Sequence, residues 1–184
     1  MTALALLAEE IGVSERTLRR AVNEGSLRAT RPTPRNVQLP LSERRYVRRS
    51  WRLISALRAA LRTEKNVRFA LLFGSAARGT DTTASDVDVL VQMRDSSLER
   101  IVDLGAKLSA IVGRRVDLVR LEDAESEPTL LADLVGEGRV LVDRGGQWAG
   151  LRRREAGLRQ RGRVQDARSA QAALVGIDRL VAAE

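Results

Sequence analysis

The 184-residue sequence contains neither cysteine nor histidine, and it has only two lysines and five aromatic residues. The absence of cysteine excludes disulfides, thiolate zinc sites and cysteine nucleophiles. The absence of histidine excludes imidazole bases, histidine metal ligands and a Ser-His-Asp triad. Any catalysis by this chain therefore has to rely on carboxylates, hydroxyls, arginines and a bound cation.

Long hydrophobic runs are also missing, because none approaches the ~20 residues that a membrane span needs. The N-terminal region is acidic at Glu9 and Glu10, where a signal peptide is basic. These features predict a cytosolic protein with no membrane partner. Apolar residues make up 43% of the chain, which is typical of a globular protein with room for one domain or two small ones.

Charge is unevenly distributed along the chain. Residues 1–65 carry a net charge of +8, residues 66–145 carry −4 and residues 146–184 carry +4. A basic segment joined to an acidic one indicates two modules with different partners, the first a polyanion and the second a cation.

The N-terminal segment has the pattern of two short helices. Apolar residues recur at helical spacing from Leu4 to Ile11, Gly12 ends that helix, and Ser14 is placed to cap a second one that runs to about Glu24. Arginines of the second helix are expected to face solvent. The segments 27–31 and 37–39 flank a Pro-Thr-Pro-Arg-Asn stretch and predict a short hairpin.

The stretches "GVSERTLRRAVNEGSLRATR" and "LSERRYVRRSW" resemble the winged helix-turn-helix of the MerR and excisionase families over about the first 50 residues. The resemblance implies binding to double-stranded DNA, expected to be the chain's own promoter. It assigns DNA contacts to the recognition-helix residues Arg16, Thr17, Arg19 and Arg20 and to the wing residues Arg31 and Arg35. The alternative is a three-helix packing module with a solvated arginine face.

A third helix is predicted from Ser42 to about Arg62, with an apolar stripe that includes Trp51, Ile54 and Leu57. A helix of that length is expected to contact both modules. The same stripe could instead support a homodimer, and the sequence leaves that choice open.

Three short apolar runs in the middle segment are bordered by a glycine or contain aspartates. The run 67–73 ends at Gly74-Ser75, a second run begins inside Asp86-Val87-Asp88, and a third contains Asp117. On a strand, residues i and i+2 share a face, so Asp86 and Asp88 are expected side by side, with Asp117 on a neighbouring strand. Such carboxylates repel one another unless a cation lies between them, and hard oxygen ligands suit Mg²⁺.

"GSAARGTDTTASDVDVLV" with the later "RRVDLVRL" resembles the minimal nucleotidyltransferases, small relatives of the polymerase-β-type enzymes. "PTLLADLVGEGRVLVDR" is similar to the helix and strand with which those domains end. The resemblance implies transfer of a nucleoside monophosphate from an NTP such as ATP. It places the triphosphate on Gly74, Ser75 and Arg78, and Mg²⁺ on Asp86, Asp88 and Asp117, which are also the catalytic residues. A structural salt bridge is an equal alternative for Arg78.

Members of that family occur in toxin-antitoxin pairs, so the resemblance implies a cognate HEPN-type toxin as the partner that receives AMP, on a tyrosine hydroxyl. A fused DNA-binding module favours the antitoxin role. Two alternatives remain open: a nucleotidyltransferase toxin that modifies tRNA, and a transcriptional regulator whose inactive second domain senses nucleotide.

These interpretations predict an α/β (α+β) protein in which a winged helix-turn-helix accompanies a polymerase-β-like domain, a small mixed sheet flanked by helices. The predicted divisions are 1–41 for the DNA-binding domain, 42–65 for the connecting helix, 66–145 for the nucleotidyltransferase domain and 146–184 for a helical tail. The glycines at 145–146 are expected to form a hinge. Two tail helices are predicted, about 152–161 and 164–183, the second with an apolar cluster at Leu174, Ile177, Leu180 and Val181.

Overall fold

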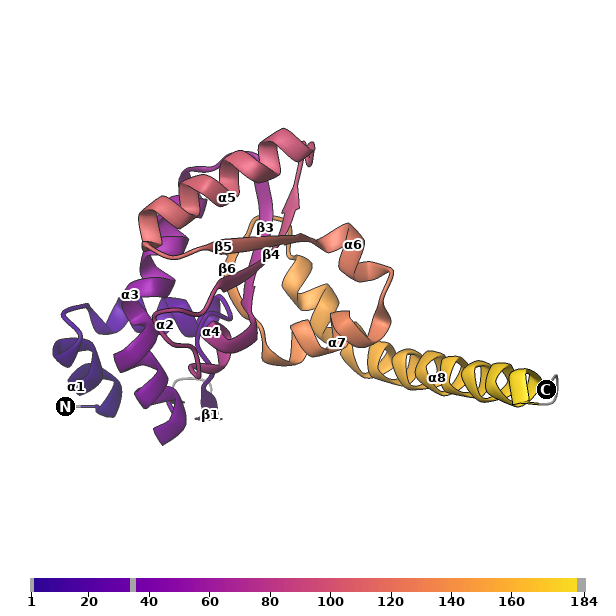
Figure 1. The fold of residues 1–184 in the computed structure, drawn as a ribbon. Helices are drawn as coiled ribbons and strands as arrows, with labels where there is room; N and C mark the ends of the chain where they lie inside the picture. Colours follow the sequence, from indigo (N-terminus) through magenta and orange to yellow (C-terminus); the bar gives the residue numbers. More distant parts are fainter. Residues whose placement is uncertain (1, 34–35, 182–184) are drawn as a thin grey trace.

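A computed structural model describes residues 2–33 and 36–181, with residues 165–181 described as helical backbone. A four-stranded mixed sheet is flanked by helices, and a two-stranded hairpin lies near the N-terminus, as Figure 1 shows. This confirms the predicted fold class. The helices are α1 (Ala3–Glu10), α2 (Glu15–Asn23), α3 (Leu41–Thr63), α4 (Gly74–Arg78), α5 (Leu98–Val112), α6 (Leu121–Glu125), α7 (Pro128–Glu137) and α8 (Gln147–Val181). The strands are β1 (Thr30–Thr33), β2 (Asn36–Gln38), β3 (Val67–Phe73), β4 (Val87–Met93), β5 (Val116–Arg120) and β6 (Arg139–Asp143).

The four-stranded sheet has the order β5-β4-β3-β6. Strand β3 pairs antiparallel with β4 and β6, whereas β4 and β5 are parallel. Parallel pairing requires a crossover connection, and α5 supplies it between β4 and β5. The C-terminal end of β3 and the N-terminal ends of β4 and β5 consequently meet at one edge of the sheet, where the sequence places its glycine and its carboxylates.

Alternation along β3 gives the sheet two buried faces. Ala70 and Leu72 belong to a core shared with α3 and α5, while Phe69 and Leu71 belong to a second core shared with α6, α7 and the start of α8. Successive residues of a strand point to opposite faces. Because both faces of this sheet are covered, β3 is apolar at nearly every position.

The first helix pair forms where its caps predict. The Thr2 hydroxyl accepts a hydrogen bond from the Ala5 N–H, and the Ser14 hydroxyl accepts one from the Thr17 N–H at 3.1 Å. Each bond satisfies an amide that a helix N-terminus leaves without an internal partner. The hairpin β1–β2 follows, so the order of elements is the one expected for helix, turn, helix and hairpin.

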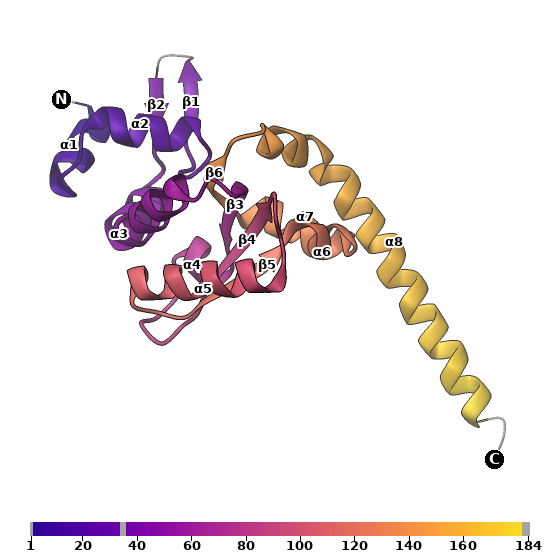
Figure 2. The same cartoon turned by 90° about the horizontal axis from the view of Figure 1, so that it is seen from above.

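The N-terminal elements pack directly against the sheet. The Val140 N–H in edge strand β6 donates to the Gly25 carbonyl at 3.1 Å, and the buried Ser26 hydroxyl donates to the Val140 carbonyl at 2.5 Å. One continuous hydrophobic core contains side chains of α1, α2, α3 and the sheet. Figure 2 shows α2 and the hairpin beside the start of α8.

Helix α8 is one continuous helix, so the prediction of two tail helices is wrong. The glycines expected to form a hinge, 145–146, lie in the turn before α8, where Gly146 has a φ of +71° and the Asp143 carboxylate accepts hydrogen bonds from the Gln147 and Trp148 N–H groups. Beyond this start, Gly162 lies against Thr129 of α7 and supports close helix packing instead of a break. The apolar cluster predicted at Leu174, Ile177, Leu180 and Val181 lies outside the described side chains.

The far half of α8 extends away from the rest of the molecule in both ribbon views (Figures 1 and 2). Within the described part of the chain, no helix combines the length and the apolar character needed to cross a bilayer.

Candidate active site

The bend after β3 is built on a glycine that cannot be replaced without strain. Gly74 has a φ of +67°, a left-handed conformation that favours glycine, and a Cβ added there would collide with the Asp88 carboxylate. Residues 74–78 then form the short helix α4, and Gly79 ends it at a φ of +77°. The backbone at Gly74 therefore lies directly against a carboxylate.

Two of the three predicted catalytic carboxylates lie side by side. Asp88 of β4 and Asp117 of β5 are register partners in the parallel pair, so their side chains leave the sheet next to each other. Val87 and Val89 are buried, as expected for the residues that alternate with Asp88. Asp86 is exposed and directly precedes β4, not within it.

The electrostatics of these carboxylates are repulsive. Burial raises the pKa of the Asp88 carboxyl, the charges of Asp117 and Asp86 raise it further, and Arg78 opposes them. No hydrogen bond to the Asp88 carboxylate is found among the described residues. Asp88 is therefore the carboxylate that gains most from a cation placed beside it.

The three carboxylates do not form a closed ligand cluster. Among the described side chains, those of residues 2–33 and 36–164, no group of three acidic residues is close enough together to hold a metal ion. Asp117 instead accepts a hydrogen bond from Arg115 Nε at 2.8 Å, and Arg115 is 72% exposed. Since that arginine is largely in solvent, its ion pair is weak and easily exchanged for another cation.

Arg78, the third residue assigned to the triphosphate, lies in α4 beside this region. Its guanidinium donates to Glu137 Oε2 at 2.5 Å, and both side chains are about half exposed. The structure thus contains the salt bridge that was the alternative for Arg78. The arginine nevertheless lies near enough to Asp88 to lower the pKa of that carboxyl.

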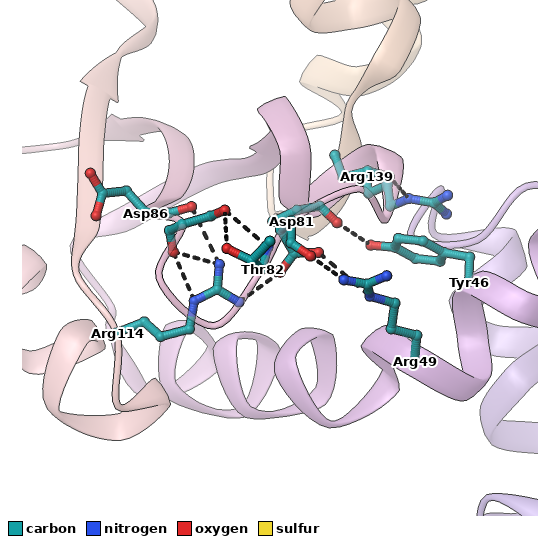
Figure 3. Close-up of polar contacts among 10 residues, drawn as sticks. Tyr46, Arg49, Asp81, Thr82, Asp86, Arg114 and Arg139 are labelled. Atoms are coloured by element: carbon teal, nitrogen blue, oxygen red, sulfur yellow. Dashed lines mark hydrogen bonds and ion pairs between the residues drawn. The ribbon is translucent and has the colours of Figure 1, made fainter.

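A buried ion pair that the sequence analysis missed holds the loop before β4. Arg114 Nη1 contacts Asp81 Oδ2 at 2.6 Å, with side chains only 18% and 9% exposed. Arg114 Nε and Nη2 also donate to the Ser85 carbonyl, at 2.9 and 2.6 Å. Figure 3 shows Arg114 facing Asp81, while the Asp86 side chain points away from both. Arg114 therefore ties the loop that carries Asp86 to the start of β5.

The same loop is fixed from the other side by α3. Arg49 donates to the Asp81 carbonyl, and its Nε lies 4.0 Å from Asp81 Oδ1, a buried oxygen that has no hydrogen-bond partner in the described chain. Within the loop, the Thr82 N–H donates to the Ser85 hydroxyl at 2.9 Å. No spacing rule points to Asp81 and Arg114, because the two residues come together only through the fold.

The residues predicted to contact DNA fall into three groups. Arg16, Thr17 and Arg20 are exposed along one face of α2, although Arg20 forms an ion pair with Glu24 at 2.7 Å. Arg19 is half-buried and paired with Glu15, so it is less available than the sequence indicates. Arg31 of the hairpin donates to Asn23 Oδ1 at 2.6 Å, whereas Arg35 lies outside the described residues.

Comparison with known proteins identifies the middle of the chain. Residues 55–146 match the family described as polymerase beta nucleotidyltransferase. The protein adenylyltransferase MntA of Thermococcus cleftensis is 36% identical over 86 residues, which is 45% of this chain and 87% of that relative.

Solved structures show the same fold. A chain from a toxin-antitoxin crystal structure with AMP-PNP has a TM-score of 0.53 and 25% identity, covering 66% of this chain and 97% of its own length. A chain from a mutant toxin-antitoxin pair, MntA-HpeT, has a TM-score of 0.50 and 24% identity, covering 68% and 97%. The chain therefore belongs to the polymerase β nucleotidyltransferase family and is a nucleotidyltransferase.

Proposed function

We propose that the chain is a Mg²⁺-dependent adenylyltransferase of antitoxin type, which transfers AMP from ATP to a hydroxyl of a cognate HEPN-type toxin. The observation that carries this proposal is the position of Asp88, which lies against Gly74 at the bend and beside Asp117 on the next strand. A triphosphate bound at the bend would meet the carboxylates at its reacting end. The adenylyltransferase relative and the AMP-PNP structure support the choice of ATP.

The residues at the bend fit a phosphate chain. The lack of a side chain at Gly74 lets a ligand approach the backbone closely, and Ser75 offers an amide N–H and a hydroxyl that has no hydrogen-bond partner among the described residues. Arg78 can turn from Glu137, because that ion pair is half exposed.

The carboxylates fit Mg²⁺ chemically, because repulsion from Asp117 and Asp86 raises the pKa of Asp88 and a cation would relieve it. Asp86 and Asp88 would hold the ion, and Asp117 would join them after leaving Arg115. When bound, Mg²⁺ supplies a positive charge that stabilises the phosphate oxygens.

The remaining chemistry is a displacement at the α-phosphorus. The acceptor oxygen forms a bond to that phosphorus while the bond to the bridging oxygen of the β-phosphate breaks, so that pyrophosphate leaves. The acceptor loses its proton, and Asp117, beside Asp88 on the next strand, would take it.

The acceptor tyrosine has to come from another molecule. The chain has one tyrosine, Tyr46, which is only 5% exposed and donates a hydrogen bond to the Ala76 carbonyl at 3.1 Å. Modification of its own tyrosine would therefore require unfolding of α3. This favours a partner protein, and the toxin-antitoxin structures make a toxin the natural candidate.

The test is incubation of the purified chain with ATP, Mg²⁺ and the product of the neighbouring gene, followed by mass spectrometry. We expect AMP on a tyrosine of that product, lost in Asp86→Asn and Asp88→Asn and kept in Asp95→Asn, which lies in an exposed turn. Transfer that survives both site variants would reject the metal assignment. Labelling of tRNA instead of protein would favour the toxin alternative, and absence of pyrophosphate release would favour the nucleotide-sensing regulator.

We also infer that the N-terminal elements bind promoter DNA. The support is the exposed face of α2, where Arg16, Thr17 and Arg20 follow one another at helical spacing next to the hairpin. Such a helix can enter a major groove with arginines donating to phosphates and guanine edges. Arg16→Ala and Arg20→Ala should weaken binding and its salt dependence while leaving transfer intact, as measured by gel shift and AMP transfer.

A further inference from the structure

A cationic cavity lies where the N-terminal elements meet the start of α8. It has a volume of about 390 Å³, and its wall includes Arg28 and Arg31, the glycines Gly25 and Gly136, and the α8 residues Trp148 and Arg152. None of its lining residues in the described chain is acidic. We refer to it as the Arg28 cavity.

Two of the three arginines that line the Arg28 cavity form no ion pair among the described residues. Arg28 donates to the Glu137 carbonyl at 2.5 Å and Arg31 to the Asn23 side-chain carbonyl, so both are bonded to neutral oxygens. Neither has a carboxylate within ion-pair distance among the described residues. Burial lowers the pKa of the Arg28 guanidinium and the charge of Arg139 lowers it further, against the opposing charges of Glu43 and Glu137, so an anion bound there would be stabilised.

The nearby carboxylates already have partners. Glu43 holds Arg139 through both carboxylate oxygens, at 2.5 and 3.0 Å, and Glu137 holds Arg78. On the α8 side, Arg152 bonds Glu155 and lies 5.6 Å from the centre of the Trp148 ring, half exposed toward the cavity. Two of the three guanidinium groups that line this cavity, those of Arg28 and Arg31, therefore have no carboxylate partner among the described residues, whereas Arg152 has Glu155.

The Arg28 cavity is continuous with the exposed face of α2. Arg31 lines it and bonds Asn23, which follows Arg16 and Arg20 along that face at helical spacing. Figure 2 shows the hairpin, α2 and the beginning of α8 together on this side of the molecule. A polyanion bound along α2 and the hairpin would therefore lie directly beside the cavity.

We propose that the Arg28 cavity binds backbone phosphates of the duplex DNA held by α2, so that the DNA-binding surface continues onto Arg152 of the nucleotidyltransferase part. This rests on the proposed DNA binding of the N-terminal elements and extends it to Arg152, which lies outside the predicted helix-turn-helix. Guanidinium groups suit phosphate recognition because they donate two hydrogen bonds at a fixed geometry.

The experiment measures fluorescence anisotropy of the full chain with a labelled duplex taken from the DNA upstream of its coding sequence, over a series of salt concentrations. Arg152→Gln should weaken binding by roughly tenfold, the loss of one charged hydrogen bond. It should also reduce the salt slope by about one unit. Arg153→Gln is the matched control, because it removes the same charge from the adjacent exposed position, which does not line the cavity.

The outcomes separate this inference from the DNA binding on which it rests. Equal affinities and salt slopes for Arg152→Gln and Arg153→Gln, with binding still lost in Arg16→Ala and Arg20→Ala, would overturn the cavity assignment alone. Failure of the wild-type chain to bind the duplex would overturn both the cavity assignment and the proposed DNA binding. If single-stranded RNA bound more tightly than the duplex and depended on Arg152, the cavity would be an RNA site and the proposal would be wrong.

Discussion

At the residue scale, Gly74 and Asp88 define the site, because the carboxylate occupies the space that a side chain at position 74 would need. The backbone conformation at Gly74 and the charge of Asp88 can be tested by separate substitutions.

Gly74→Ala should abolish transfer, whereas Gly146→Ala should not. Both glycines have a positive φ, +67° and +71°, so each substitution should lower the free energy of unfolding by about 1 kcal/mol. Only Gly74 has a carboxylate against it, since nothing lies within 4 Å of a Cβ at Gly146. Denaturant unfolding and AMP transfer measure the two effects, and equal activity losses in the two variants would count against the account.

Asp88→Asn should raise the melting temperature of the metal-free protein at neutral pH. The pKa of Asp88 is raised in the folded state, chiefly by burial, so its ionised form destabilises the fold. Stability of the wild type should increase as pH falls through that raised pKa, and the advantage of Asp88→Asn should shrink over the same interval. Mg²⁺ should stabilise the wild type more than the variant, and an equal effect of Mg²⁺ on both would exclude Asp88 as a ligand.

At the scale of elements, the site depends on how the loop before β4 is held. The buried pair of Asp81 and Arg114 joins this loop to the start of β5. The same ion pair therefore fixes the starts of both strands that carry Asp88 and Asp117. Neither residue needs to touch the substrate for this effect.

Arg114→Ala should lower the free energy of unfolding by about 3 kcal/mol, because it removes the 2.6 Å ion-pair partner of the buried Asp81. Transfer should fall by roughly 100-fold through misplacement of Asp86. Arg100→Ala, which breaks a 3.7 Å ion pair with Asp95 in solvent, should change neither quantity. The added cost of Arg114→Ala in an Asp81→Ala background should be smaller, and full additivity of the two losses would argue against a coupled pair.

Much of this element arrangement could be predicted from the sequence. The apolar runs identify β3, β4 and β5, and the expected neighbouring strand does bring Asp117 beside Asp88, although its parallel direction was not predicted. The pair of Asp81 and Arg114 could not be predicted, because its 33-residue separation carries no periodic signal. The continuity of α8 was missed because a glycine such as Gly162, unfavourable in an isolated helix, here packs against α7.

At the scale of the whole molecule, a buried network connects the proposed DNA-binding elements to the bend. Arg139 donates to the Ala77 carbonyl of α4 at 2.6 Å, bonds Glu43 of α3 and lies 3.4 Å from the centre of the Tyr46 ring. Arg139 also donates to the Ser26 carbonyl after α2. The elements that carry the two proposed activities therefore share one set of buried contacts.

This network predicts a single unfolding transition. The two tryptophans, Trp51 in α3 and Trp148 in α8, report on different parts of the chain, so in the Trp51→Phe protein and in the Trp148→Phe protein the remaining tryptophan should show the same denaturant midpoint as far-UV circular dichroism of that variant. Arg139→Met should lower the free energy of unfolding seen by both probes by about 4 kcal/mol, because it leaves Glu43 unpaired in the interior. Two separate midpoints would mean that the parts fold independently.

The proposed activity requires transfer of the α-phosphorus at the bend. The most direct measurement compares ATP labelled at the α-phosphorus with ATP labelled at the γ-phosphorus, using wild type and Asp88→Asn with the neighbouring-gene product as acceptor. We expect label in the acceptor from the α position only, and only with the wild type. Label from the γ position, or equal labelling by Asp88→Asn, would contradict the assignment of this site.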